Sequence, residues 1–196
     1  MATNDEFCGI GTAITNPCFS HETEDGNKFY FFFMFAKRHS GVLDMFRCVI
    51  PHELTSEVEQ GKQIEVYGEV RTRNYYENDK KRTMVYVLVK EVYNARPEAI
   101  ATNSVSLDGF IAKPPIVRYT PLGRRICDVI VAVNHNGGKS SYIPCIIWGN
   151  SADIVGKKQI GDRLIVRGRL QSREYMKDGD MKIAYEVSVS EFEEGE

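Results

Sequence analysis

Arginine and aromatic side chains alternate along two segments in the second half of the chain. Arg169, Arg173 and Tyr175 are separated by even numbers of residues. The same is true of Tyr142 and Trp148. Side chains an even number apart share one face of an extended strand. Cations contact phosphates and flat rings stack on unpaired bases, so such faces suit single-stranded nucleic acid. The alternative is that the rings pack within a sheet and the arginines are only solvated.

No pattern in the sequence indicates catalysis, a metal site or a cofactor. Residues 137–141, GGKSS, match the end of a phosphate-binding loop, but Val133 stands where that motif needs its first glycine. The four histidines are isolated and lack the spacing of a zinc hydrolase or deaminase. We therefore expect a protein that is not an enzyme, with no catalytic residue, no metal and no cofactor.

Charge is distributed unevenly along the 196 residues. The net charge is −2, which excludes a globally basic mode of nucleic-acid binding but leaves a local basic face possible. Residues 1–100 hold 12 basic and 15 acidic side chains, whereas residues 101–190 hold 13 and 8. No apolar run approaches membrane-spanning length, and the first residues do not resemble a secretory leader. We expect a cytoplasmic protein with five reduced cysteines and no membrane contact.

The chain contains an internal repeat with a period of about 97–100 residues. Residues 61–76 match residues 161–176, and the match between 46–50 and 143–147 places Cys48 opposite Cys145. We therefore predict two domains of one kind. The first copy comprises residues 1–97 and the second copy comprises residues 101–196.

Each copy is predicted to contain five strands and one short helix. In the second copy, the strands are expected at 105–112, 124–134, 142–148, 162–174 and 182–192, with the helix following the third strand at 150–158. Five antiparallel strands with a helix between the third and fourth describe an OB-fold, a five-stranded Greek-key barrel that commonly binds oligonucleotides. The predicted fold class is all-β, with two tandem OB-fold barrels.

Three stretches of the second copy resemble the bacterial single-stranded DNA-binding protein family. They are RYTPLGRRICDVIVAVN at 118–134, YIPCIIWGNSADI at 142–154 and DRLIVRGRLQSREY at 162–175. The resemblance covers most of residues 104–193 in the right order and places the family's stacking aromatics at Tyr142, Trp148 and Tyr175. It suggests phosphate contacts by nearby arginines, namely Arg118, Arg124, Arg125, Arg169 and Arg173.

The first copy departs from this pattern. Tyr75 and Arg73 are retained opposite Tyr175 and Arg173, and we include both in the expected binding set. The two other aromatics, Tyr142 and Trp148, are replaced by Met45 and Pro51. Arg169 and Arg118 are replaced by Glu69 and Ser20, and a carboxylate at 69 is expected to repel phosphate. Two roles remain open for the first copy: it contributes a smaller part of the DNA binding, or it serves mainly in assembly of the protein. In the first case the binding side chains would be Tyr67, Arg71, Arg73, Tyr75, Tyr76, Lys80, Lys81 and Arg82.

The resemblance implies binding of single-stranded DNA with little sequence preference during replication, recombination or repair. It also implies a homodimer with four OB domains, and replication or repair proteins as possible partners. The family's acidic Pro-Phe tip is absent from the ending EFEEGE. Two alternatives remain: an adaptor that interacts with proteins and binds DNA weakly, and a binder of single-stranded RNA.

Overall fold

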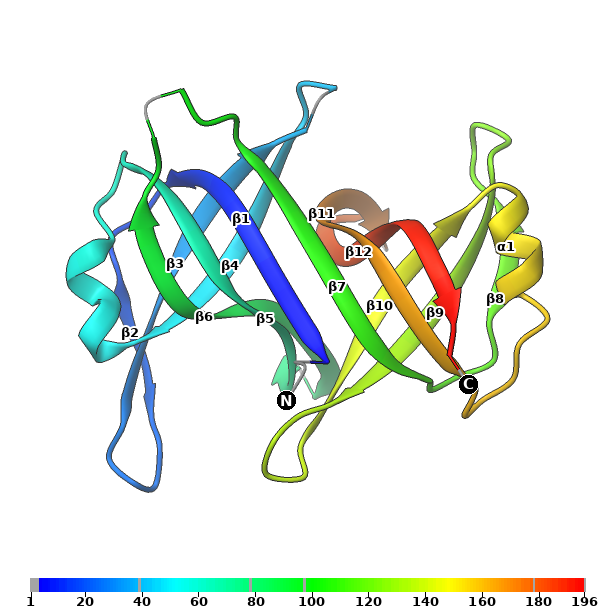
Figure 1. Cartoon of the computed structure of the whole chain (residues 1–196), viewed down its shortest axis with the longest axis horizontal. Helices are drawn as coiled ribbons and strands as arrows, with labels where there is room; N and C mark the ends of the chain where they lie inside the picture. The colour runs from blue at the N-terminus through cyan, green and yellow to red at the C-terminus, as the bar shows by residue number, and fades with distance from the viewer. Residues whose placement is uncertain (1–3, 39, 78, 97, 178, 196) are drawn as a thin grey trace. The chain divides into compact units, whose positions relative to one another are not determined.

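The computed structural model describes residues 4–38, 40–77, 79–96, 98–177 and 179–195. It is an all-β chain of two tandem OB-fold barrels (Figure 1). Contacts divide it into two compact units. One unit contains Glu6–Arg71 and Val85–Ser104, and the other contains Met1–Asp5, Thr72–Met84 and Val105–Glu196. The hairpin segment Thr72–Met84 therefore groups with the second copy, although the repeat assigns it to the first.

The first copy is built from six strands and a short 3-10 helix. They are β1 (Asp5–Ala13), β2 (Cys18–Glu22), β3 (Lys28–Lys37), β4 (Leu43–Pro51), η1 (His52–Glu57), β5 (Gln63–Glu77) and β6 (Lys80–Asn94). Strand β1 pairs with β3 and β5, β3 pairs with β4, and β4 runs parallel to β6. Pairing of β5 with β6 closes the barrel. Alternate residues of these strands, such as Phe32, Met34 and Phe46, fill its core.

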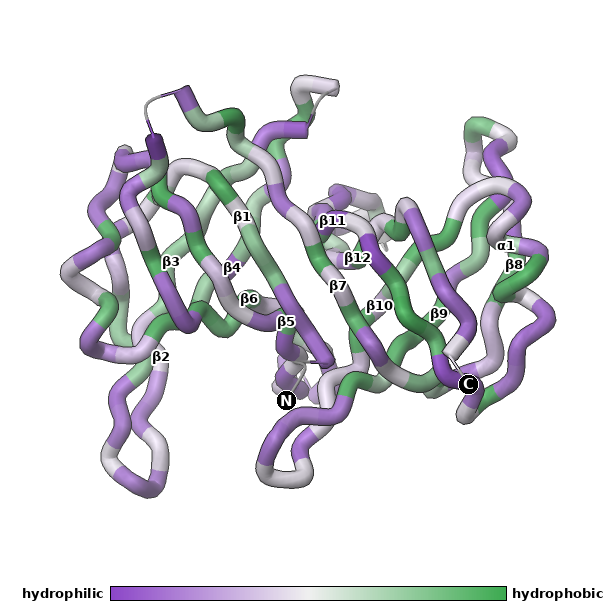
Figure 2. Tube along the Cα trace, in the orientation of Figure 1, coloured by the Kyte–Doolittle hydropathy of each residue, from purple (hydrophilic) through white to green (hydrophobic). Residues whose placement is uncertain are grey.

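The second copy repeats this order. Its elements are β7 (Thr102–Ile111), β8 (Ile116–Tyr119), β9 (Arg125–Asn134), β10 (Ser140–Trp148), α1 (Asn150–Val155), β11 (Arg163–Lys177) and β12 (Asp180–Glu194). Strand β7 pairs with β9 and β11, β9 with β10, β10 in parallel with β12, and β11 with β12. Apolar and polar residues alternate along these strands (Figure 2), as expected for sheets with one buried face.

The five longer strands of the second copy lie close to their predicted positions, but the predicted count of five strands in each copy is too low. Each copy has a sixth short strand, β2 or β8, which pairs with the edge of β3 or β9. All four residues of β8 are exposed, so no burial pattern marked it. The helix of the first copy is a 3-10 helix that begins directly after Pro51, and the Val58 N–H donates to the Thr55 carbonyl at its end.

Gly68 and Gly168 occupy the same place in the two copies, where two backbones approach closely. A Cβ at Gly68 would lie 2.2 Å from the Leu88 carbonyl oxygen, and one at Gly168 would lie 2.2 Å from that of Ser188. Gly109, in the interior of β7, also lies at a close approach, because a Cβ there would be 2.4 Å from the Ala132 oxygen. No helix in the described part of the chain is long and apolar enough to cross a membrane.

Candidate nucleic-acid interface

Strand β10 separates its side chains between the core and the outer surface of the second barrel. Ile143, Cys145 and Ile147 are buried. Tyr142 is 53 % exposed and Trp148 is partly exposed. Ile146 has the outward parity but is buried, because β12 runs beside it in parallel register. The predicted outer face thus exposes aromatic side chains at the two ends of one strand.

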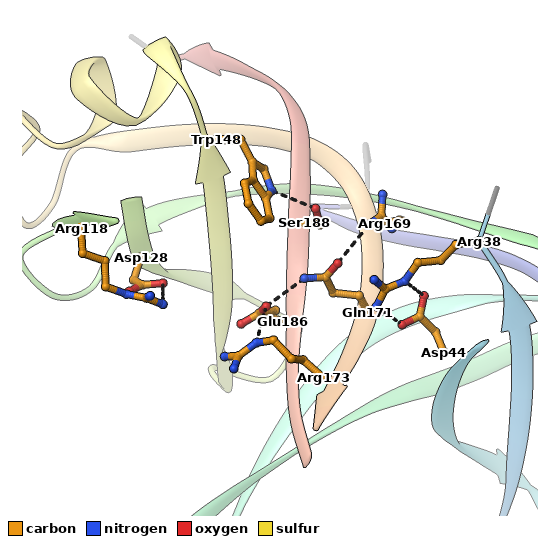
Figure 3. A network of polar contacts seen from close by, with 10 residues as sticks. All are labelled: Arg38, Asp44, Arg118, Asp128, Trp148, Arg169, Gln171, Arg173, Glu186 and Ser188. Atoms are coloured by element: carbon orange, nitrogen blue, oxygen red, sulfur yellow. Dashed lines mark hydrogen bonds and ion pairs between the residues drawn. The ribbon is translucent and has the colours of Figure 1, made fainter. Parts of the chain in front are cut away.

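Trp148 is fixed on this face by a hydrogen bond. Its indole Nε1–H donates to the Ser188 hydroxyl at 3.1 Å, from β10 to β12 (Figure 3). Ser188 is buried and pairs with Arg169 of β11 in the antiparallel register. Residues directly opposite in such a register share a face of the sheet. Trp148 and Arg169 therefore lie on the same outer surface.

A chain of polar contacts continues from Arg169 along this surface (Figure 3). The Arg169 Nη2 donates to Gln171 Oε1 at 3.1 Å, and Gln171 Nε2 donates to Glu186 Oε1 at 2.8 Å. Arg173 Nε reaches the same Glu186 oxygen at 3.4 Å. Glu186 is a carboxylate that the sequence analysis did not place on the face. A phosphate that binds Arg173 must compete with it.

Two further predicted arginines are paired with carboxylates. Arg118 forms a two-pronged ion pair with Asp128 (Figure 3), and the hydrogen bonds that Arg118 donates to this carboxylate raise the pKa of Arg118. Arg125 forms an ion pair with Asp153. Arg124 is exposed and forms no ion pair within the described residues. The local positive field is therefore smaller than the arginine count alone suggested.

Tyr175 and Tyr75 lie near the ends of the two long hairpins. The guanidinium carbon of Arg173 lies 5.6 Å from the centre of the Tyr175 ring, within cation–π range. Tyr75 and Arg73 are exposed, and both belong to the hairpin segment that groups with the second copy. This grouping was not apparent from the sequence, because the repeat assigned both residues to the first copy.

Within that unit, two hydrogen bonds from backbone N–H groups to side-chain hydroxyls hold Thr72 close to Tyr142. The Tyr142 N–H donates to the Thr72 hydroxyl at 2.9 Å, and the Thr72 N–H donates to the Ser141 hydroxyl at 3.1 Å. Ser141 is buried, and its hydroxyl also lies 2.9 Å from Nε2 of His135. The start of β10, and with it the position of Tyr142, is therefore fixed by three polar contacts.

Glu69 of the first copy has its charge compensated, which corrects the expectation that it repels phosphate. The carboxylate is buried and forms ion pairs with Arg71 and Lys90. Partial burial raises the pKa of Glu69, but hydrogen bonds and charges from Lys90 and Arg71 outweigh this effect and leave the pKa lowered. Arg71 is consequently already paired with a carboxylate, unlike the free phosphate contact suggested by the sequence.

The remaining side chains proposed for weak binding in the first copy are mixed. The Tyr67 hydroxyl donates to Glu65 at 2.5 Å, and this hydrogen bond raises the pKa of Tyr67. A carboxylate therefore lies beside that ring. Tyr76 is highly exposed. Arg82 forms an ion pair with Glu77, in which its Nε lies 3.5 Å from the Oε2 of the carboxylate. Lys80 and Lys81 are exposed.

The described residues contain no group of three or more histidine, cysteine or acidic side chains that could hold a metal ion. All five cysteines are free thiols. Burial raises the pKa of Cys48 and Cys145, which occupy matching places in the two barrel cores. These two thiols are therefore protonated packing groups.

The sequence of the second copy matches known proteins. The profile of the Single-strand binding protein family matches residues 102–194. A single-stranded DNA-binding protein of Clostridium tetani is 31 % identical over 97 residues, which are 45 % of this chain and 67 % of that relative. The chain belongs to the single-strand binding protein family. Its resemblance to that family, drawn from the sequence motifs, is confirmed.

Other members of the single-strand binding protein family match over smaller parts of their length. Single-stranded DNA-binding protein 2 of Listeria monocytogenes is 34 % identical over 94 residues, which cover 44 % of this chain and 58 % of the relative. The Deinococcus radiodurans protein is 28 % identical over 102 residues, 47 % of this chain and 34 % of that protein. The chain thus spans between a third and two thirds of these three relatives.

The likeness of fold extends over both copies. The crystal structure of the wild-type single-stranded DNA binding protein from Thermus aquaticus superposes with a TM-score of 0.78. The match covers 98 % of this chain and 93 % of that one at 22 % sequence identity. At this identity the likeness concerns the fold, and it agrees with the tandem barrels predicted from the repeat.

Proposed function

We propose that this protein binds single-stranded DNA with little sequence preference and has no catalytic activity of its own. The observation that supports this most is Trp148, a partly exposed ring held by Ser188 on the same surface as Arg169. The family membership of the second copy points the same way. The protein would protect strands exposed during replication, recombination or repair, and this work on DNA would take place in the cytoplasm.

Binding in this proposal combines stacking with exchange of ion pairs. Bases stack on Tyr142, Trp148 and Tyr175, each stack being worth about 1–3 kcal/mol. Backbone phosphates contact the arginines and the hairpin residues, namely Arg118, Arg124, Arg125, Arg169, Arg173, Arg73 and Tyr75. Arginines already paired with carboxylates, such as Arg118, exchange one anion for another. They contribute less affinity than a free arginine would.

The first test uses the only tryptophan of the chain. Oligo-dT is added at low and moderate salt while Trp148 fluorescence is recorded, with duplex DNA and oligo-rU as controls. We expect strong quenching by dT that weakens with salt, with a slope of about −0.7 per phosphate contacted. Absence of both quenching and a gel-mobility shift would contradict DNA binding. Equal or stronger binding of rU would assign the surface to RNA.

We also propose that the domains are residues 1–97 and 101–196 and that two chains form a homodimer with four barrels. The matching strand order of the two halves supports the domain boundaries. Sedimentation equilibrium should give twice the mass of 22.3 kDa. A monomeric mass over the concentration range used for DNA binding would overturn the dimer. Replication or repair proteins are proposed as further partners.

A further inference from the structure

Strand β3 of the first copy carries a row of phenylalanines on its outer side. Phe29, Phe31, Phe33 and Phe35 alternate with core residues and are each partly exposed. The residues between them from position 32 onward are buried in the barrel. Core packing therefore accounts for one side of β3 only. The four outer rings form an aromatic row along this sheet face, in which Phe29 stacks on His21 with ring centres 5.1 Å apart.

Phe35 lies directly opposite Met45, the residue of the first copy that corresponds to Tyr142. In the second copy, exposed Tyr142 of β10 is paired with Ala132 of β9. In the first copy, the corresponding pair is Met45 of β4 with Phe35 of β3. Residues directly opposite in an antiparallel pair have Cβ atoms about 4.5–5.5 Å apart. Both copies therefore have an aromatic ring on this patch of the barrel, on the third long strand in the second copy and on the second long strand in the first.

The same exchange is found at the position of Trp148. In the second copy, Trp148 is paired with Ile126, whereas the corresponding pair in the first copy is Pro51 with Phe29. The first copy lacks these two aromatics on its third long strand, β4. In each case a phenylalanine stands directly opposite, on the second long strand, β3. At both ends of this strand pair, the first copy therefore has an aromatic side chain directly opposite the position that is aromatic in the second copy.

The charge of this face suits a polyanion. The guanidinium of Arg47 lies over the Phe31 ring, 3.6 Å from its centre, and 5.9 Å from that of Phe33. Lys37 is exposed on the same side as Phe35. The acidic residue of the strand pair, Asp44, is buried on the opposite side and bound by Arg38. The outward residues described on β3 and β4 therefore include cations but no carboxylate.

We propose that the phenylalanine face, defined as Phe29, Phe31, Phe33, Phe35 and Arg47, is a second binding surface for single-stranded DNA. OB-folds bind oligonucleotides on the face of their second and third strands, which are β3 and β4 in this copy. Bases stack on Phe33 and Phe35 and on the guanidinium plane of Arg47, while Phe29 and Phe31 support His21 and Arg47 from below. This inference rests on the proposed function, and it adds a site in the copy whose motif had diverged.

The first experiment removes the main rings of the second copy from the full-length chain. Fluorescence anisotropy of labelled oligo-dT is measured for Tyr142→Ala/Trp148→Ala, and then for the same protein carrying Phe33→Ala and Phe35→Ala. We expect the double variant to retain salt-sensitive binding. The two added substitutions should weaken it by about tenfold per ring. Phe19→Ala, at an exposed ring on β2, serves as the matched control and should change little.

The outcomes separate this inference from the proposed function. If the wild-type chain does not bind dT, the proposed function fails. If the wild type binds and the double variant does not, only the phenylalanine face fails. If Phe33→Ala/Phe35→Ala leaves dT affinity unchanged but lowers the mass in sedimentation, the face is an interface between copies of this chain, and the inference is overturned.

A second measurement uses the wild-type protein, so it does not depend on how the variants fold. Oligonucleotides containing 5-iododeoxyuridine are photo-cross-linked to the protein, which is then digested with trypsin. Cleavage after Lys28 and Lys37 releases residues 29–37, which contain all four outer phenylalanines in one peptide. We expect nucleotide adducts on this peptide at subsaturating DNA. Adducts confined to peptides of the second copy would overturn the inference.

Discussion

The indole nitrogen of Trp148 and the hydroxyl of Ser188 are 3.1 Å apart and join β10 to β12 on the outer side of the second barrel. The two residues are 40 positions apart in sequence, and the bond depends on the parallel pairing of these strands. A ring held in this way meets a base with little loss of side-chain freedom. Under the proposed function, the Ser188 hydroxyl therefore holds the Trp148 ring in position for stacking.

Removing that hydroxyl should weaken DNA binding without removing the ring. Ser188→Ala is expected to lower oligo-dT affinity several-fold, because a net hydrogen bond is worth about 0.5–1.5 kcal/mol. The measurement is quenching of Trp148 fluorescence. Ser190→Ala is the matched control, since this exposed hydroxyl on the same strand donates to the Arg167 carbonyl. If the two variants behaved alike, Ser188 would have no role in positioning Trp148.

Loss of the Tyr142 ring should be more costly than loss of another exposed tyrosine. Tyr142→Ala is expected to weaken dT binding by about 1–3 kcal/mol, the value of one stacked base. Tyr93→Ala serves as the control, because Tyr93 is 52 % exposed and its hydroxyl donates to Glu91. Anisotropy titrations at one salt concentration give the comparison. Equal losses in the two variants would show that Tyr142 is not a stacking position.

Neutralising Glu186 should strengthen DNA binding. Glu186→Gln removes the carboxylate that Arg173 and Gln171 contact and leaves both donors near an amide oxygen. We expect several-fold tighter binding at low salt and a salt slope steeper by about 0.7, the value of one phosphate contact. Glu194→Gln, which removes an exposed carboxylate paired with Lys158, controls for net charge. An identical change in both variants would reduce the effect to long-range electrostatics.

The Glu69 ion pairs should stabilise the first copy in a pH-dependent way. The pKa of Glu69 is lowered in the folded chain, so its ionised form stabilises the fold at neutral pH. That contribution is lost as the pH falls below the ordinary value of 4.5 and through the lowered one. Glu69→Gln should cost about 1–2 kcal/mol of unfolding free energy at pH 7 and much less at pH 3.

Urea unfolding at the two pH values tests this expectation. Glu59→Gln is the control, because Glu59 forms an exposed pair with Lys62 and exposed pairs contribute little. Its effect should be small at both pH values. A cost for Glu69→Gln that did not depend on pH would mean that packing, and not charge, is what the substitution disturbs.

Sequence alternation predicted one strand of the site well. In β10 the apolar residues Ile143, Cys145 and Ile147 alternate with Tyr142 and Trp148, and the structure buries the first set. Alternation is reliable there because only one face of the strand packs on the core. The repeat likewise predicted the two barrels, since the positions of residues such as Cys48 and Cys145 depend on the fold alone.

The carboxylate at Glu186 could not be predicted in the same way. Residues 186–189 of β12 are all buried, so that stretch has no alternating pattern. Its outward side is covered by Trp148 and Gln171, side chains from two other strands. The pairing of Arg118 with Asp128 was missed for a related reason. It depends on the short strand β8, whose exposed residues carry no burial signal.

The internal repeat has a consequence for how these surfaces can change. Phe35 and Tyr142 belong to one polypeptide but are encoded separately, so a substitution at one leaves the other as it was. In an assembly built from identical single barrels, every substitution appears in every barrel at once. Duplication within the chain removes that coupling. The arrangement of rings in one half can therefore change while that in the other half stays the same.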